Sequence, residues 1–183
     1  PGPEGFPTVD EFHEMIALCE ALPCFAWLDG TTAGEQDIEE LVGLMVEKGT
    51  VAVNIIPDRN WNIKDPETRR IKVQNLHDFV RLAQELDLPL NVGTEMNKHG
   101  QGFVDDFFAG PMRPVRDVFL RGARIMTGHT LLIRSLGIGL LSDAVRERFG
   151  SNLRKRNDFF EQIGALKPES GAKSVKEMWE KGA

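Results

Sequence analysis

The sequence predicts an α/β fold in which parallel strands and helices alternate over residues 1–110 and helices alone follow over residues 111–183. Three short apolar runs, CFAWL, TVAVNII and LPLNVGT, are separated by segments with apolar residues at helical spacing. No comparable run follows Gly110. Strands joined through helices lie parallel, because the crossover returns the chain to the same end of the sheet.

The first helix is predicted by a capping box and by its apolar spacing. Thr8 and Glu11 precede an apolar run, and in this arrangement each side chain accepts a hydrogen bond from the backbone N–H of the other residue. Apolar residues then recur every three or four positions. We therefore expect a helix over 9–22 and a buried strand over 24–28.

Similar signals place the other elements of residues 1–110. A second capping box, Thr32 with Glu35, predicts the start of the next helix, and Gly49 supplies the left-handed residue that ends it. Asp65 followed by Pro66 combines an N-cap with proline at the first helical position. The further elements are a strand over 50–56, a helix over 65–86 and a strand over 88–94.

Residues 111–183 show helical spacing without a strand signal. The sequence Gly137-Ile138-Gly139 interrupts the pattern, and Ser151 and Ser174 are expected N-caps. The predicted helical segments are 114–126, 130–136 as a continuation or a new helix, 140–149, 151–164 and a short last helix around Ser174 and Glu177.

Composition argues against nucleic-acid and membrane partners. The net charge is -6, and no apolar run approaches the roughly 18 residues that a membrane-spanning helix needs. Cys19 and Cys24 lack C-x-x-C spacing, so we expect both to be reduced core residues. We expect a cytoplasmic protein. Because Pro1 stands where an initiator Met would, the chain is expected to be a processed product, a trimmed chain or a piece of something longer.

The charge is divided unevenly along the chain. Residues 1–110 hold 20 acidic and 8 basic side chains, whereas residues 111–183 hold 8 acidic and 14 basic side chains. Two explanations are open. The halves present opposite surfaces that attract each other and help them dock, or the basic half supplies arginines to an anionic substrate.

Polar side chains follow each of the three predicted strands. Because parallel strands end at the same edge of a sheet, and that edge carries the site in open α/β sheets and α/β barrels, these side chains are expected to lie together. They are Asp29 after the first strand, Asp58 and Asn60 after the second, and Glu95, Asn97, Lys98 and His99 after the third. This agreement among three strands is the main indication of a site.

The strand-end side chains have the chemistry of a divalent-metal or acid/base site. Carboxylate, amide and imidazole groups favour Mg or Mn over a structural zinc, and the expected cofactor is a divalent metal (Mg, Mn or Zn). The expected roles are metal binding by Asp29, Asp58, Glu95 and His99, catalysis by Glu95, His99 and Asp58, and substrate binding by Asn54, Asn60, Asn97 and Lys98. In the alternative interpretation Asp29-Gly30 is only a turn, and Asp58 with Asn60 only caps a loop.

Two positions inside the strands also bear on the site. Asn54 lies between apolar residues of the second strand, so its amide must find a partner, either in a core network or in the site. Gly93 shares a strand face with Glu95, and we expect it to leave room for a ligand or a metal.

The strand ends read AWLDG, NIIPDRN and NVGTEMN. Over about residues 20–106 they resemble the later β/α units of a metal-dependent hydrolase barrel of the amidohydrolase or PHP kind. The resemblance implies part of a TIM-type barrel, a divalent metal, and late-strand site residues at Glu95, His99 and Asp58. Such families bind metal through an H-x-H pair on an early strand, and this sequence contains no H-x-H pair. The resemblance therefore implies that the early strands lie outside this chain.

We accordingly expect the C-terminal portion of a metal-dependent hydrolase that acts on a small, anionic substrate. The alternative is a non-catalytic fragment or interaction domain, in which the strand-end side chains are relics or loop caps. Three parallel strands leave open edges that invite pairing. We therefore also expect a homo-oligomer, or the missing N-terminal half of the same protein, to cover the sheet.

Overall fold

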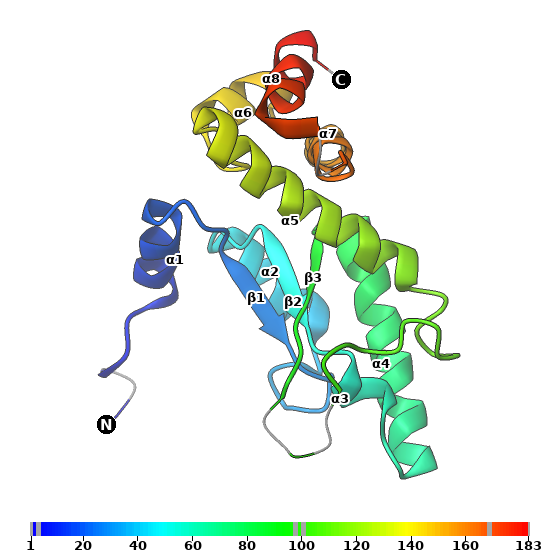
Figure 1. Ribbon diagram of the computed structural model, residues 1–183. Helices are drawn as coiled ribbons and strands as arrows, with labels where there is room; N and C mark the ends of the chain where they lie inside the picture. Colours follow the sequence, from blue (N-terminus) through cyan, green and yellow to red (C-terminus); the bar gives the residue numbers. More distant parts are fainter. Residues whose placement is uncertain (1, 3–4, 97–98, 100–101, 168–169, 183) are drawn as a thin grey trace.

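The computed structural model describes residues 2, 5–96, 99, 102–167 and 170–182, which form a mixed α/β structure (Figure 1). Its three strands are parallel, as predicted, and they lie in the order β1-β2-β3 in the sheet. The strands are β1 (Cys24–Trp27), β2 (Ala52–Ile55) and β3 (Leu90–Val92); the helices are α1 (Val9–Leu18), α2 (Ile38–Glu47), α3 (Asp58–Trp61), α4 (Pro66–Glu85), α5 (Arg116–Leu136), α6 (Asp143–Phe149), α7 (Leu153–Gly164) and α8 (Gly171–Lys181).

One face of the sheet is covered and builds the first core. Trp27, Val53, Ile55 and Leu90 are each no more than 1% exposed, and alternate residues of a strand share a face. The Trp27 ring stacks on Phe79 of α4, with ring centroids 4.5 Å apart and planes 4° from parallel. This stack attaches the amphipathic α4 to the sheet.

In the described structure, the opposite face of the sheet is open only in part, because Ala52 at the start of β2 lies on it and is buried. Cys24, Ala26 and Asn91 lie on this face and are exposed, and Asn54 between them is half-buried. The expectation that the cysteines are core residues was wrong, because Cys19 and Cys24 are both exposed, although both are free thiols as predicted. Cys24 lies on the open face rather than in the packed one.

Of the two alternatives left open for residues 130–136, the continuation is correct: α5 runs unbroken to Leu136 and ends at Gly137, which adopts φ 67°, where the sequence predicted a break. A Cβ added at Gly122 would lie 1.9 Å from Leu90 O, and one added at Gly128 would lie 2.0 Å from Phe160 O. These glycines therefore let α5 approach the backbone of β3 on one side and of α7 on the other. In Figure 1, α5 lies between the sheet and the group α6, α7 and α8.

The α6–α8 group encloses a second core, in which Ile125, Leu132, Phe160 and Ile163 are each no more than 1% exposed. The first residues of α5 belong instead to the core of the sheet, through Phe119. One helix thus contributes to both cores and joins residues 111–183 to the β/α part of the chain.

The helix boundaries test the capping predictions. The Thr8–Glu11 capping box is present and starts α1. The Thr32–Glu35 box does not start α2, which begins at Ile38 with Asp37 as its N-cap. Ser151 and Ser174 are not caps either; Asn152 caps α7, and Ser174 lies inside α8, where its hydroxyl donates to a backbone carbonyl. Within the described residues, no helix is long and apolar enough to cross a membrane.

Candidate functional site

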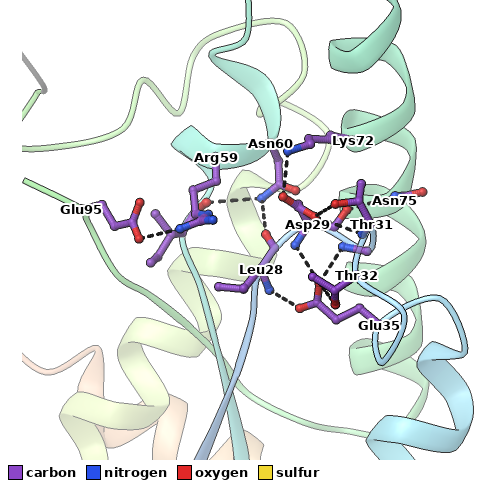
Figure 2. Close-up of polar contacts among 12 residues, drawn as sticks. Leu28, Asp29, Thr31, Thr32, Glu35, Arg59, Asn60, Lys72, Asn75 and Glu95 are labelled. Carbon is purple, nitrogen blue, oxygen red and sulfur yellow. Dashed lines mark hydrogen bonds and ion pairs between the residues drawn. The ribbon is translucent and has the colours of Figure 1, made fainter. Parts of the chain in front are cut away.

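The parallel register brings the ends of the three strands to one edge of the sheet. Trp27 pairs with Ile55, and Ile55 pairs with Val92, so the residues that follow each strand start from the same level. Figure 2 shows the outcome, with Asp29 on one side of the edge and the Arg59–Glu95 pair on the other. Asp58 and Glu95 line the same two spaces at this edge, whereas Asp29 lines neither of them and pairs with Lys72 instead.

Asp29 is tied into the fold by an ion pair with α4. Its side chain is 8% exposed, and Oδ2 lies 2.7 Å from Lys72 Nζ. Burial opposes ionisation of Asp29, but the hydrogen bonds from Lys72 and Thr31 outweigh it and hold the pKa of the carboxyl below its usual range. The backbone carbonyl of Asp29 also accepts from Asn75 Nδ2 at 3.0 Å. Asp29 thus stays ionised with its carboxylate engaged by protein groups.

Glu35 stabilises the turn that follows β1, a role that the sequence pattern did not predict. It is 8% exposed, and its carboxylate accepts from the backbone N–H groups of Leu28 at 2.6 Å and Gly30 at 3.2 Å (Figure 2). The Thr32 hydroxyl also donates to it, at 3.2 Å. The carboxylate therefore organises the turn after β1 instead of capping α2.

Asn60 braces the same turn from α3. It is fully buried, and its Nδ2 donates to the carbonyls of Leu28 at 3.0 Å and Ile56 at 3.3 Å. The amide therefore links the end of β1 to the end of β2. These contacts favour the alternative interpretation, in which Asn60 caps a loop, over substrate binding, because its amide nitrogen donates to backbone carbonyls.

Arg59 and Glu95 form an ion pair across the ends of β2 and β3. Arg59 Nη1 lies 2.7 Å from Glu95 Oε1, with side-chain exposures of 36% and 29%. Both line an open pocket of about 350 Å³, together with Asp58, Thr68 and Lys72. The pocket wall thus carries two acidic and two basic side chains, of which Arg59 pairs with Glu95 and Lys72 pairs with Asp29.

A smaller cavity adjoins this pocket and is surrounded by carboxylates. It measures about 20 Å³ and is lined by Asp58, Glu95 and Asp105, with Thr94, Gly102 and Val104 completing the wall. A space of this size accommodates about one water-sized occupant. Glu95 lines both spaces, so it stands at the border between the pocket and the cavity.

Asp105 is a carboxyl group of this cavity whose pKa is shifted by its surroundings. Burial, together with the nearby Asp58 charge, raises the pKa of its carboxyl above the ordinary value. Oδ1 accepts from Trp61 Nε1 at 3.3 Å, whereas Oδ2 is buried without a partner among the described residues. A carboxyl that holds its proton more tightly because of burial and a nearby carboxyl group is a typical feature of acid/base sites. Asp105 was not among the predicted site residues, although it lies in the polar stretch after β3.

The predicted strand-interior residues lie on the open face. Asn91 Nδ2 donates to Asn54 Oδ1 at 3.1 Å, so the amide of Asn54 has a partner on the neighbouring strand. A Cβ at Gly93 would lie 3.2 Å from Asn54 Nδ2. The Asn54 amide therefore fills the space beside Gly93, and the prediction that this space would admit a ligand or a metal was wrong.

Of the three other predicted residues, the structure describes only His99. His99 is exposed in a turn. Asn97 and Lys98 lie outside the described residues, so their predicted roles stay predictions. Among the residues that the structure describes, no group of three or more His, Cys, Asp or Glu side chains has a geometry that could hold a metal ion. The three carboxylates around the small cavity therefore do not converge on one point, and Glu95 turns to Arg59 instead.

Comparison with protein-family models, curated proteins and solved structures gave no match.

Proposed function

We propose that this chain carries the strand-end site of a barrel-type hydrolase that acts on a small, anionic substrate with the help of a divalent cation. The observation that carries the proposal is the meeting of Asp58, Glu95 and Asp105 around a one-water cavity beside a larger pocket that contains Arg59 and Lys72. Acidic groups for proton transfer or a cation stand beside basic groups for an anion, an arrangement that hydrolysis of an anionic substrate can use.

The two carboxyl groups of the cavity take different roles. Asp105, whose pKa is raised by burial and by Asp58, keeps its proton more readily while no cation is bound and would release it when a cation binds. Asp58 stands on the pocket side, where one of its oxygens accepts from Asn62 Nδ2 at 2.8 Å. Arg59 and Lys72 orient the anionic group of the substrate from the pocket wall.

The donor set suits a hard cation better than zinc. Asp58 and Asp105 supply oxygen donors, and Mg²⁺ commonly binds through one or two carboxylates while it keeps several waters. The buried, unpartnered Oδ2 of Asp105 supports this fit. These two residues would hold the cation, which supplies charge stabilisation and water activation when bound. Glu95 joins them only when Arg59 releases it.

Titration with Mn²⁺, monitored by calorimetry and by electron paramagnetic resonance, tests the proposal on this chain. Asp58→Asn and Asp105→Asn should each abolish binding or weaken it at least tenfold. Glu85→Gln removes an exposed charge from the last turn of α4 and serves as the matched control. Equal Mn²⁺ affinity in all four proteins, or no binding by any of them, would refute the cation site.

The barrel itself is part of the proposal. The sheet face with Ala26, Asn54 and Asn91 would line the interior of a barrel, and the other face already carries outer helices. Further strands would first add beside β1, because α5 packs against the Leu90 backbone at the free edge of β3. The missing strands would come from the rest of the same protein or from a homo-oligomer. Turnover of small phosphate or carboxylate esters should then require the completed barrel.

A second candidate is an interaction module without catalysis, and α1 favours it. Phe12, Met15 and Leu18 of this helix are 48%, 51% and 80% exposed, and His13 is its one residue described as buried. An exposed apolar stripe of this kind is typical of a surface that a partner covers. Sedimentation of wild type and of Leu18→Asp tests this candidate. Self-association that the substitution abolishes, combined with no Mn²⁺ binding, would favour the interaction module.

A further inference from the structure

A further cavity, separate from the pocket that contains Arg59 and Glu95, lies along β3 and the first half of α5. Its volume is about 440 Å³, which is within the range of small-molecule pockets. Most of its wall is apolar: Val92, Phe107, Phe108, Phe119, Leu120 and Ala123. We call this cavity the β3–α5 groove.

The floor of the β3–α5 groove is fixed and its rim is exposed. Phe119 is 3% exposed and belongs to the core of the sheet, and Phe107 packs against it edge-to-face at 5.9 Å. Phe108 and Leu120, by contrast, are 66% and 47% exposed. A ligand with an apolar body would remove this exposed surface from water without rearranging the floor, which favours binding.

A single charged side chain stands in this apolar wall. Among the lining residues that the structure describes, Arg116 is the charged one, and its guanidinium carbon lies 5.3 Å from the centroid of the Phe108 ring. The side chain of its acidic neighbour Asp117 is 84% exposed, and Asp117 Oδ1 lies 3.3 Å from Arg116 Nη2, so this ion pair is weak. The amide of Asn91 adds a neutral polar group to the same wall.

We propose that the β3–α5 groove binds a small molecule that combines a flat apolar body with one carboxylate. The body packs against Phe107, Phe108 and Leu120, and the carboxylate accepts hydrogen bonds from the Arg116 guanidinium. One guanidinium matches the charge of one carboxylate, and its planar fork matches the geometry of the two oxygens. The proposal is independent of the strand-end site, because Asp58, Glu95 and Asp105 do not line this groove among the described residues.

The probe is 1-naphthylacetate, titrated into the chain and followed by calorimetry and by the shifts of the Asn91 side-chain amide in NMR. Arg116→Gln should weaken binding about tenfold, since it removes the charge-assisted hydrogen bonds and keeps a long polar side chain. Arg134→Gln, an exposed substitution near the other end of α5, should leave the affinity unchanged. The neutral amide of the probe should bind wild type about tenfold more weakly than the acid does.

Three outcomes would overturn the proposal. The first is no binding of the acid at millimolar concentration. The second is equal affinity of acid and amide, or of wild type and Arg116→Gln, which would show that the groove binds any apolar body. The third is a stable dimer that Leu120→Asp dissociates, because the groove would then be covered by a second copy of the chain.

Discussion

Replacement of Gly122 by alanine should destabilise the fold, although alanine is the better helix former. A Cβ at this position would meet Leu90 O at 1.9 Å and Leu90 C at 2.8 Å, and both atoms belong to the backbone of β3. To reach ordinary van der Waals contact, α5 would have to move away by about 1.5 Å. Such a shift separates the helix from the sheet and disturbs the packing around Phe119.

The magnitude follows from two opposing effects. Gly→Ala inside a helix contributes up to about 1 kcal/mol through propensity and the entropy of the unfolded chain. Overpacking a core contact typically costs about 1–3 kcal/mol, and more where backbone must move. We therefore expect Gly122→Ala to lose about 2 kcal/mol of unfolding free energy in urea denaturation.

Gly43 provides a control with the same chemistry and the opposite expected sign. It is an exposed residue of α2, and a Cβ added there meets nothing within 4 Å. Gly43→Ala should therefore stabilise the protein by about 0.5–1 kcal/mol. If both substitutions stabilised the protein equally, α5 would not lie on β3 as described, and the floor of the β3–α5 groove would be in error.

Three further predictions concern the carboxylates at the strand ends. Glu35→Gln should lower the free energy of unfolding in urea by about 2 kcal/mol, because the single amide oxygen cannot accept from all the backbone N–H groups that the carboxylate satisfies. The control Glu39→Gln, on the exposed side of α2, should change it by less than about 0.5 kcal/mol. The pKa of Asp29 is lower in the folded than in the unfolded chain, so its stabilisation is present above the unfolded pKa and is lost as the pH falls through the folded pKa. Asp29→Asn should therefore reduce the loss of unfolding free energy at acidic pH. An unchanged loss would contradict the ion pair with Lys72. The pKa of Asp105 is raised instead, so ionisation of Asp105 lowers the free energy of unfolding as the pH rises through the unfolded and then the folded pKa. Asp105→Asn should therefore be at least as stable as wild type at pH 7. A large loss of stability at pH 7 would show that the ionised carboxylate stabilises the fold.

Sequence patterns were informative where the deciding interactions are local. The alternation of apolar runs and helical spacing predicted three parallel strands, since each element is specified by its own residues. The Thr8–Glu11 capping box was confirmed, and its hydrogen bonds all lie within four consecutive residues at the start of α1. Strand polarity then predicted the shared edge where Asp29, Asp58 and Glu95 lie.

The same capping pattern failed at Thr32 and Glu35, and the difference is tertiary. Glu35 lies next to a turn whose backbone N–H groups are buried and need an acceptor, and a carboxylate satisfies several of them at once. Nothing in four consecutive residues contains that information. The long α5 is a similar case, because Gly122 and Gly128 appear as helix-weakening residues until β3 and α7 are packed against them.

The chain by itself thus determined which residues form strands and which charged groups reach the strand ends. Only the tertiary structure decided the partners of those groups. The pairs Lys72–Asp29, Arg59–Glu95 and Trp61–Asp105 join positions 43, 36 and 44 residues apart. A carboxylate is a metal ligand, a proton carrier or half of an ion pair according to what stands beside it, because neighbouring charge and burial set its free energy of ionisation.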